Sequence, residues 1–180
     1  MDDGWFFPLI ILPVIYVLLI EMKSLNWLGF TRHKIQLSVI IGTSIAIVLI
    51  VVHYPIFLRY LPNIIAQKFP DLYGILLDVV WYPVYEEITY RSFFLTHFSE
   101  FNESWFTNRN LIVNLVQSVL FLVIHKHHFG IPLVLISVFL LTFLNGLLFL
   151  RTRNIFGCIF SHSLLNSAAL LLMYANMTVK

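Results

Sequence analysis

Apolar stretches of roughly bilayer length follow one another along this chain, with only short polar links between them. A helix needs about 20 mostly apolar residues to cross the hydrocarbon core of a membrane. Six segments approach that length, and the first, Trp5–Ile20, is short for a span. The others are Ile35–Val52, Leu72–Thr96, Leu111 to about His125, Ile131–Leu150 and Ile155–Tyr174. The pattern predicts an all-α polytopic integral membrane protein with about six transmembrane helices.

The composition argues against an ordinary soluble core. Apolar residues make up 59% of the 180 residues and charged residues 11%, whereas soluble domains average roughly 45–50% and 25%. A soluble core of this size cannot hide so much apolar surface, so we expect the excess to face membrane lipid. The net charge is only +2 and the lysines and arginines are scattered. No basic stripe indicates a nucleic-acid partner.

The links between the apolar stretches indicate one membrane domain over residues 1–180. The acidic start lacks the basic region of a secretory signal, so we expect the first apolar run to be retained as a span. Ile56–Pro70 is aromatic, mixed and bounded by prolines, which favours an interfacial helix or loop. The polar loop Ser99–Asn110 offers Asn108 or Asn110 as the N-cap of the next helix.

The positive-inside rule gives a weak prediction of orientation in the membrane. If the N-terminus lies outside, the outer segments hold Arg59, Lys68, Lys126 and Lys180. The inner loops then hold six basic residues, which are Lys23, Arg32, Lys34, Arg109, Arg151 and Arg153. The small excess inside favours this orientation.

An acidic pair, Glu86 and Glu87, lies within an apolar segment, and Arg91 follows it. An ionised group at that depth costs several kcal/mol unless it is paired or hydrated, so it marks a functional site by default. Glu87 and Arg91 are four residues apart, which places them on one helical face as an ion pair. Pro83 removes a helical donor beside Glu86 and loosens a turn where water can enter.

Two further spans carry polar faces at helical spacing. Asn114, Ser118, Phe121 and His125 share one face of the fourth span. On the sixth span Cys158, His162 and Asn166 also share a face. Lipid does not solvate such faces, so we expect them to point at one another and at Glu86, around a polar active-site cavity between helices.

These residues resemble three motifs of a known family. Glu86-Glu87-x-x-x-Arg91, Phe121-x-x-x-His125 and His162-x-x-x-Asn166 are similar to the motifs of the CAAX-protease and bacteriocin-processing family, which includes Rce1-type prenyl-protein endopeptidases. The segment from Asn145 to His162 also looks like the family's approach to its third motif. The resemblance covers about residues 81–166, and places a catalytic core at about residues 72–174.

The resemblance implies a multi-pass intramembrane protease of the cell membrane, in a prokaryotic plasma membrane. Glu86 would be the general base that activates a water together with His125, while His162 and Asn166 would bind the developing oxyanion. Glu87 and Arg91 would form the supporting ion pair. The implied substrate is a membrane-anchored peptide or protein, such as a prenylated or C-terminal sorting tail or a bacteriocin-type peptide.

The need for a metal is open at this stage, because the family has been described both as metalloproteases and as glutamic proteases. The chain lacks the His-Glu-x-x-His helix of many zinc peptidases. Glu86, His125 and His162 could still supply the three protein ligands of a catalytic zinc. We favour a glutamic, metal-free reaction.

Two other functions fit the same residues. One is a non-catalytic membrane protein of this fold, for example an immunity or scaffolding factor. The other is a small ion or solute transporter that uses Glu86, Asp78 and the histidines as a relay. The chain shows no inverted repeat of the kind that many transporters have.

Overall fold

The computed structural model describes residues 12–65, 71–101, 104–125 and 132–178, and every regular element within these ranges is a helix. The bounds of the elements are η2 Tyr16–Ile20, α2 Ile35–Ile65, α3 Leu72–Leu76, η3 Leu77–Trp81, α4 Tyr82–Glu87, η4 Ile88–Leu95, α5 Thr96–Phe98, α6 Asn108–Ile124, α7 Pro132–Thr152 and α8 Phe156–Thr178. The all-helical class predicted from the apolar pattern is confirmed over these residues.

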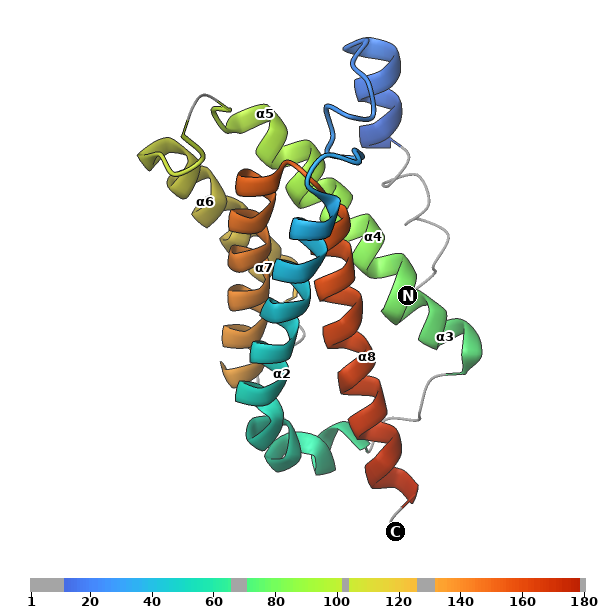
Figure 1. Ribbon diagram of the computed structural model, residues 1–180. Helices are drawn as coiled ribbons and strands as arrows, with labels where there is room; N and C mark the ends of the chain where they lie inside the picture. Colours follow the sequence, from blue (N-terminus) through green and yellow to red (C-terminus); the bar gives the residue numbers. More distant parts are fainter. Residues whose placement is uncertain (1–11, 66–70, 102–103, 126–131, 179–180) are drawn as a thin grey trace.

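Three long helices, α2, α7 and α8, run side by side through the molecule (Figure 1). Two glycines allow α2 and α8 to approach closely. A Cβ atom added to Gly42 would meet the carbonyl oxygen of Gly157, and one added to Gly157 would meet Ser38. Small residues at such contacts are typical of helix pairs in membranes, where close backbone packing replaces the hydrophobic effect.

The acidic pair belongs to a long helical run from Leu72 to Phe98, which crosses the other helices obliquely (Figure 1). Asp71 caps the start of this run by accepting a hydrogen bond from the Gly74 N–H at 2.9 Å. Two π-helical stretches, η3 and η4, flank α4, the short α-helix that carries Glu86 and Glu87. Such wide turns are frequent at functional sites.

One local prediction is corrected, and one helix is longer than its predicted span. The apolar span Ile35–Val52 lies within α2, which continues as a helix beyond Pro55 to Ile65, with a bend at its lower end (Figure 1). A proline removes one helical hydrogen bond and often bends a helix without ending it. The N-cap of α6 is Thr107, which accepts from the Asn110 N–H at 3.1 Å. Asn110 instead ties down the loop, with its side chain bonded to Glu100 and to Trp105 O.

The extent of membrane crossing is only partly supported by the helices themselves. Ile35–Val52 in α2 and Val134–Thr152 in α7 are long and apolar enough to cross a membrane. Asn108–Ile124 and Phe156–Leu172 are apolar but shorter. Residues 5–11 of the first predicted span and residues 66–70 of the predicted interfacial segment lie outside the described residues. The number of crossings and the interfacial helix therefore stay predictions.

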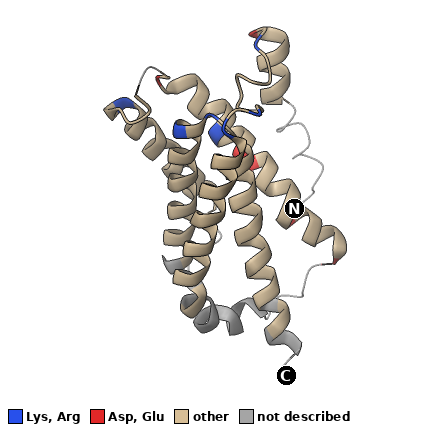
Figure 2. Cartoon of the chain, viewed as in Figure 1, with Lys and Arg blue, Asp and Glu red and all other residues tan. Residues whose placement is uncertain are grey.

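One end of the helix bundle is polar and basic. The turn between α7 and α8 lies there, and Asn154 Nδ2 donates to the carbonyls of Thr31 and His33, which precede α2. Arg153 donates to Trp27 O and lies 3.3 Å over the Phe101 ring. Most of the described lysines and arginines gather near this end (Figure 2). The grouping agrees with the predicted inner side, and the orientation itself stays a prediction.

Candidate active site

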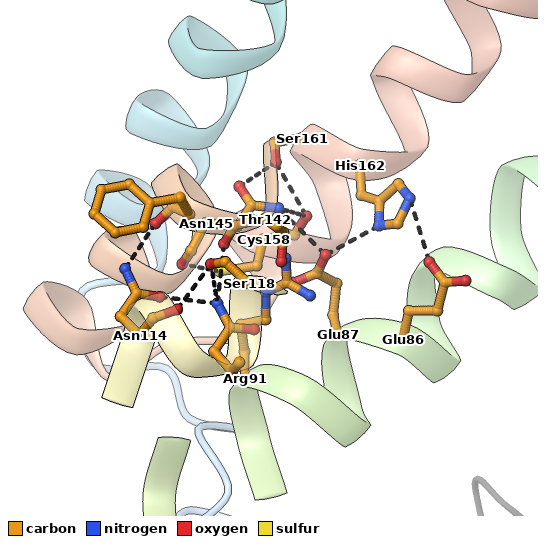
Figure 3. Close-up of polar contacts among 12 residues, drawn as sticks. Glu86, Glu87, Arg91, Asn114, Ser118, Thr142, Asn145, Cys158, Ser161 and His162 are labelled. Carbon is orange, nitrogen blue, oxygen red and sulfur yellow. Dashed lines mark hydrogen bonds and ion pairs between the residues drawn. The ribbon is translucent and has the colours of Figure 1, made fainter. Parts of the chain in front are cut away.

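The two adjacent glutamates at the end of α4 point in different directions (Figure 3). The side chain of Glu87 is completely buried, whereas that of Glu86 is 13% exposed. Neighbouring residues on an α-helix point in directions about 100° apart. The Glu87 carboxylate therefore enters the core between the helices, while the Glu86 carboxylate points elsewhere. The pair therefore divides into two separate environments.

Glu87 forms the buried half of the site and contacts three other helical segments. Arg91 Nε lies 3.0 Å from Glu87 Oε2, as a charge contact without good hydrogen-bond alignment. His162 Nδ1 of α8 lies 2.9 Å from Glu87 Oε1, and Asn145 Nδ2 of α7 donates to the same oxygen at 3.3 Å. The predicted ion pair with Arg91 is present, and Glu87 also joins η4, α7 and α8.

Arg91 is held on its far side by two further residues. Its Nη2 donates to Thr142 Oγ1 of α7 at 2.5 Å, and its guanidinium lies 5.0 Å from the centre of the Phe121 ring. Arg91 is fully buried. A buried cation needs a compensating charge, which Glu87 supplies.

The partners of Glu87 fix which nitrogen of His162 carries a proton. The Arg91 guanidinium lies beside Glu87 Oε2, and the Asn145 Nδ2 group donates to Oε1, so both contacts favour an ionised Glu87 carboxylate that only accepts. His162 Nδ1 must then be the donor in its 2.9 Å contact. The Nε2 atom of His162 is left facing Glu86 Oε2, at 3.6 Å (Figure 3).

Glu86 lies between two histidines that come from different helices. His125 follows the last residue of α6, and its Nε2 lies 3.8 Å from Glu86 Oε1. The Nδ1 atom of His125 lies 2.9 Å from the Phe121 carbonyl, which can only accept, so this nitrogen is also protonated. The His125 ring stacks on Phe121 at 4.4 Å between ring centres. Although α6 ends here, His125 reaches the level of Glu86.

Asn166 lies one turn beyond His162 on α8 and contacts a different part of the site. Its Nδ2 donates to the carbonyl oxygen of Asp78 at 2.8 Å. Asp78 belongs to the π-helical η3, whose five-residue register would pair this carbonyl with the nitrogen of Pro83. Proline has no N–H, so Asn166 supplies the missing donor. Pro83 thus explains why a side chain of α8 bonds the backbone of this turn.

The predicted polar faces meet only in part. Glu86, His125 and His162 come together. Asn114 and Ser118 lie nearer the start of α6, and they pack against α7. Asn114 Nδ2 donates to the Phe143 carbonyl at 3.0 Å, and Ser118 bonds back to Asn114 O. These side chains complete the α6–α7 contact and do not touch Glu86.

The sequence argument missed the part that α7 plays. Asn145 and Thr142 bond Glu87 and Arg91 directly, and Ser161 of α8 donates to Asn145 Oδ1 at 2.6 Å. The sequence motifs assign Asn145 no role at the site. Its polar side chain in an apolar helix, three residues after Thr142, was the available signal.

The alternative zinc site would need Glu86, His125 and His162 as its protein ligands. Glu86, His125 and His162 are neighbours, with closest nitrogen–oxygen distances of 3.6 and 3.8 Å. Within residues 12–65, 71–101, 104–125 and 132–178, no three His, Cys, Asp or Glu side chains are grouped so that they could hold a metal ion. The residues as placed do not fit a metal, so no step below is assigned to one.

Comparisons with known proteins identify the family to which the chain belongs. A search of curated proteins found no match, and a search of solved structures found none either. A family model described as type II CAAX prenyl endopeptidase Rce1-like matches residues 68–168, which is more than half of the chain and includes Glu86, His125, His162 and Asn166. The chain therefore belongs to the Rce1-like family of type II CAAX prenyl endopeptidases, which are membrane proteins.

Proposed function

We propose that this protein is an intramembrane endopeptidase of the glutamic type. Its substrate is a membrane-anchored peptide or protein, such as a prenylated or C-terminal sorting tail or a bacteriocin-type peptide. The observation that carries the proposal is the position of Glu86, which faces the Nε2 atoms of His125 and His162 at 3.8 and 3.6 Å. The family membership supports protease activity in general.

The spacing around Glu86 suits a bound water. Direct hydrogen bonds between nitrogen and oxygen are about 2.7–3.2 Å long, so contacts of 3.6 and 3.8 Å leave the groups just out of reach of one another. Neutral His125 carries its proton on Nδ1, and its Nε2 is then an acceptor, as is an ionised Glu86. A water that donates one hydrogen to each acceptor would present its oxygen lone pair to a substrate carbonyl.

Hydrolysis then follows a balanced sequence of proton movements. The water oxygen attacks the scissile carbonyl carbon while Glu86, assisted by His125, takes the proton that the water releases. The carbonyl oxygen becomes an oxyanion in the tetrahedral intermediate. When the C–N bond breaks, the proton held at Glu86 passes to the leaving amine, and the products are a carboxylic acid and an amine.

Two side chains are assigned as hydrogen-bond donors to the oxyanion. The Asn166 amide has two N–H groups, and the one not bonded to Asp78 O is the first donor. His162 can donate through Nε2 only when it is protonated on both nitrogens. That form is supported by charge balance, because the carboxylates of Glu86 and Glu87 would then face one guanidinium and one imidazolium. Preorganised donors of this kind are worth most in a dry site.

The proposal is tested by cleavage in liposomes that contain the purified protein and prenylated or bacteriocin-type peptides. Mass spectrometry in water enriched in oxygen-18 should find one heavy oxygen in the new carboxyl group. Added hydroxylamine should trap no acyl intermediate, because water attacks directly. A trapped hydroxamate would show a covalent acyl-enzyme and would reject the proposed role of Glu86.

The alternative functions have distinct outcomes in the same system. Proton or solute flux in liposomes without cleavage of any peptide would favour the transporter. Unchanged function of Glu86→Gln in cells, again without cleavage, would favour the non-catalytic immunity or scaffolding protein. The multi-pass location in a prokaryotic cell membrane and the catalytic core at about residues 72–174 belong to this proposal as well.

A further inference from the structure

Asn145 is the central residue of α7 at the candidate site, and it is completely buried. Its side chain contacts three polar groups at once. Nδ2 donates to Glu87 Oε1 at 3.3 Å and to the Cys158 carbonyl at 3.2 Å, while Oδ1 accepts from Ser161 Oγ at 2.6 Å (Figure 3). Its amide therefore connects α7, α8 and the acidic pair on α4.

We propose that Asn145 is a positioning residue, which orients the Glu87 carboxylate so that His162 keeps its proton on Nδ1. This inference rests on the proposed endopeptidase function and deepens it. Asn145 acts through Glu87 and His162 and touches neither Glu86 nor the substrate. Ser161 has a supporting part, because it holds the Asn145 amide in the required orientation.

The orientation of the Asn145 amide is determined by its neighbours. Glu87 Oε1 and the Cys158 carbonyl can only accept, so the NH₂ group must face them. Ser161 Oγ also lies 3.1 Å from the Cys158 carbonyl, but its 2.6 Å contact to Asn145 Oδ1 is the shorter acceptor contact. A reversed amide would place its oxygen against two other acceptors.

Glu87 Oε1 is shared between Asn145 and His162, which gives the amide its influence on the histidine. The oxygen accepts from His162 Nδ1 at 2.9 Å and from Asn145 at 3.3 Å. Arg91 contacts the other oxygen, Oε2. Without the amide, only Arg91 and the His162 ring itself would limit rotation of the carboxylate, and the hydrogen bond to His162 would have a less fixed direction. The Nε2 atom of His162 would then point less consistently towards Glu86.

Asn145→Ala should therefore lower kcat by about 10–100-fold, which is typical when the group that orients a site histidine is removed. KM should change by less than about threefold, because Asn145 does not contact substrate. Ser161→Ala should have a smaller effect, and the double variant should be no slower than Asn145→Ala. Cleavage by folded, monodisperse protein in liposomes measures these values.

Asn114→Ala is the matched control for loss of a buried amide. Asn114 is also fully buried, and it donates to a carbonyl of α7, Phe143 O, rather than to Glu87. Its removal should lower the free energy of unfolding with little change in kcat. Equal losses of kcat in Asn114→Ala and Asn145→Ala would mean that general helix packing explains both, and would overturn the inference.

Nitrogen-15 NMR of histidine-labelled protein in micelles gives a readout independent of cleavage, with His162→Gln used to assign the signals. When the spectra are recorded on the neutral form of His162, the wild type should show the proton on Nδ1, and Asn145→Ala should show a mixture of Nδ1–H and Nε2–H forms. Unchanged His162 signals in Asn145→Ala would overturn the inference even if activity fell. If no peptide is cleaved but the signals change as expected, the proposed function fails and the positioning role stands.

Discussion

His162 Nδ1 lies 2.9 Å from Glu87 Oε1, so the buried carboxylate of the acidic pair binds the histidine of α8 as well as the arginine of its own helix. The sequence had assigned Glu87 only an ion pair with Arg91. In the structure Glu87 also contacts Nδ1 of His162, which leaves Nε2 as the ring nitrogen that faces Glu86. The two glutamates are thus connected through one imidazole.

The first prediction concerns the stability that Glu87 provides. Glu87→Gln leaves the Arg91 cation buried without a carboxylate, and it should lower the free energy of unfolding by about 3–5 kcal/mol. Equilibrium unfolding in mixed micelles measures the change. Glu87→Gln combined with Arg91→Met should recover part of the loss, because no unpaired charge remains. If Glu87→Gln is as stable as the wild type, the buried ion pair is not formed.

A second prediction separates His125 from a histidine of similar surroundings. His125→Ala should reduce kcat/KM by about 10²–10⁴-fold, the usual contribution of a group that moves protons. His97→Ala is the control, because His97 also contacts a glutamate, with Nε2 at 2.8 Å from Glu21 Oε1, while its contacts with Phe93 and Trp27 involve no residue of the site. Cleavage assays on both variants decide the point. Similar losses for both would contradict the role of His125.

A third prediction concerns the two functions of Asn166. Asn166→Ala leaves the Asp78 carbonyl without its donor, which should cost about 1–3 kcal/mol of stability. It also removes the donor that we propose for the oxyanion, which should lower kcat by about 10²–10³-fold. The neighbouring Ser167→Ala is a suitable control, because Ser167 bonds only within α8, to Ser163 O. A loss of stability with unchanged kcat would limit Asn166 to holding the η3 turn.

A fourth prediction is that cleavage needs no added metal. The part of the chain that the structure describes contains no group of three His, Cys, Asp or Glu side chains that could hold a metal ion, and the proposed reaction uses only Glu86 and His125 to activate the water. Treatment with EDTA or 1,10-phenanthroline, followed by metal analysis of the purified protein, should leave the rate unchanged. A rate that falls with chelation and returns on addition of zinc would overturn the metal-free assignment.

Helical spacing predicted much of the site because it acts within one element. The ion pair Glu87–Arg91, four residues apart, and the shared face of Phe121 and His125 follow from the helix repeat alone. The convergence of Glu86, His125 and His162 was expected because lipid does not solvate polar faces. These expectations needed only the sequence and the physics of the bilayer.

Other features depend on contacts between helices, which no spacing reveals. The pairing of Asn145 with Glu87 requires the register of α7 against α4. The bond from Asn166 to Asp78 O follows from a π-helical turn, and a sequence does not show where a helix will widen. The N-cap is Thr107 and not Asn110, because the Asn110 side chain instead hydrogen-bonds the carbonyl of Glu100 in the preceding loop. Each of these features depends on a contact with a residue from another segment of the chain.

The central claim is that Glu86 carries the proton from the attacking water. The most direct measurement is single-turnover cleavage of a membrane-anchored peptide by Glu86→Gln, with Glu21→Gln as the control because Glu21 also contacts a histidine. Both proteins must first show unfolding transitions and micelle sizes like those of the wild type. The account predicts a rate at least about 100-fold lower for Glu86→Gln and an unchanged rate for Glu21→Gln. A folded Glu86→Gln that cleaves as fast as the wild type would contradict it.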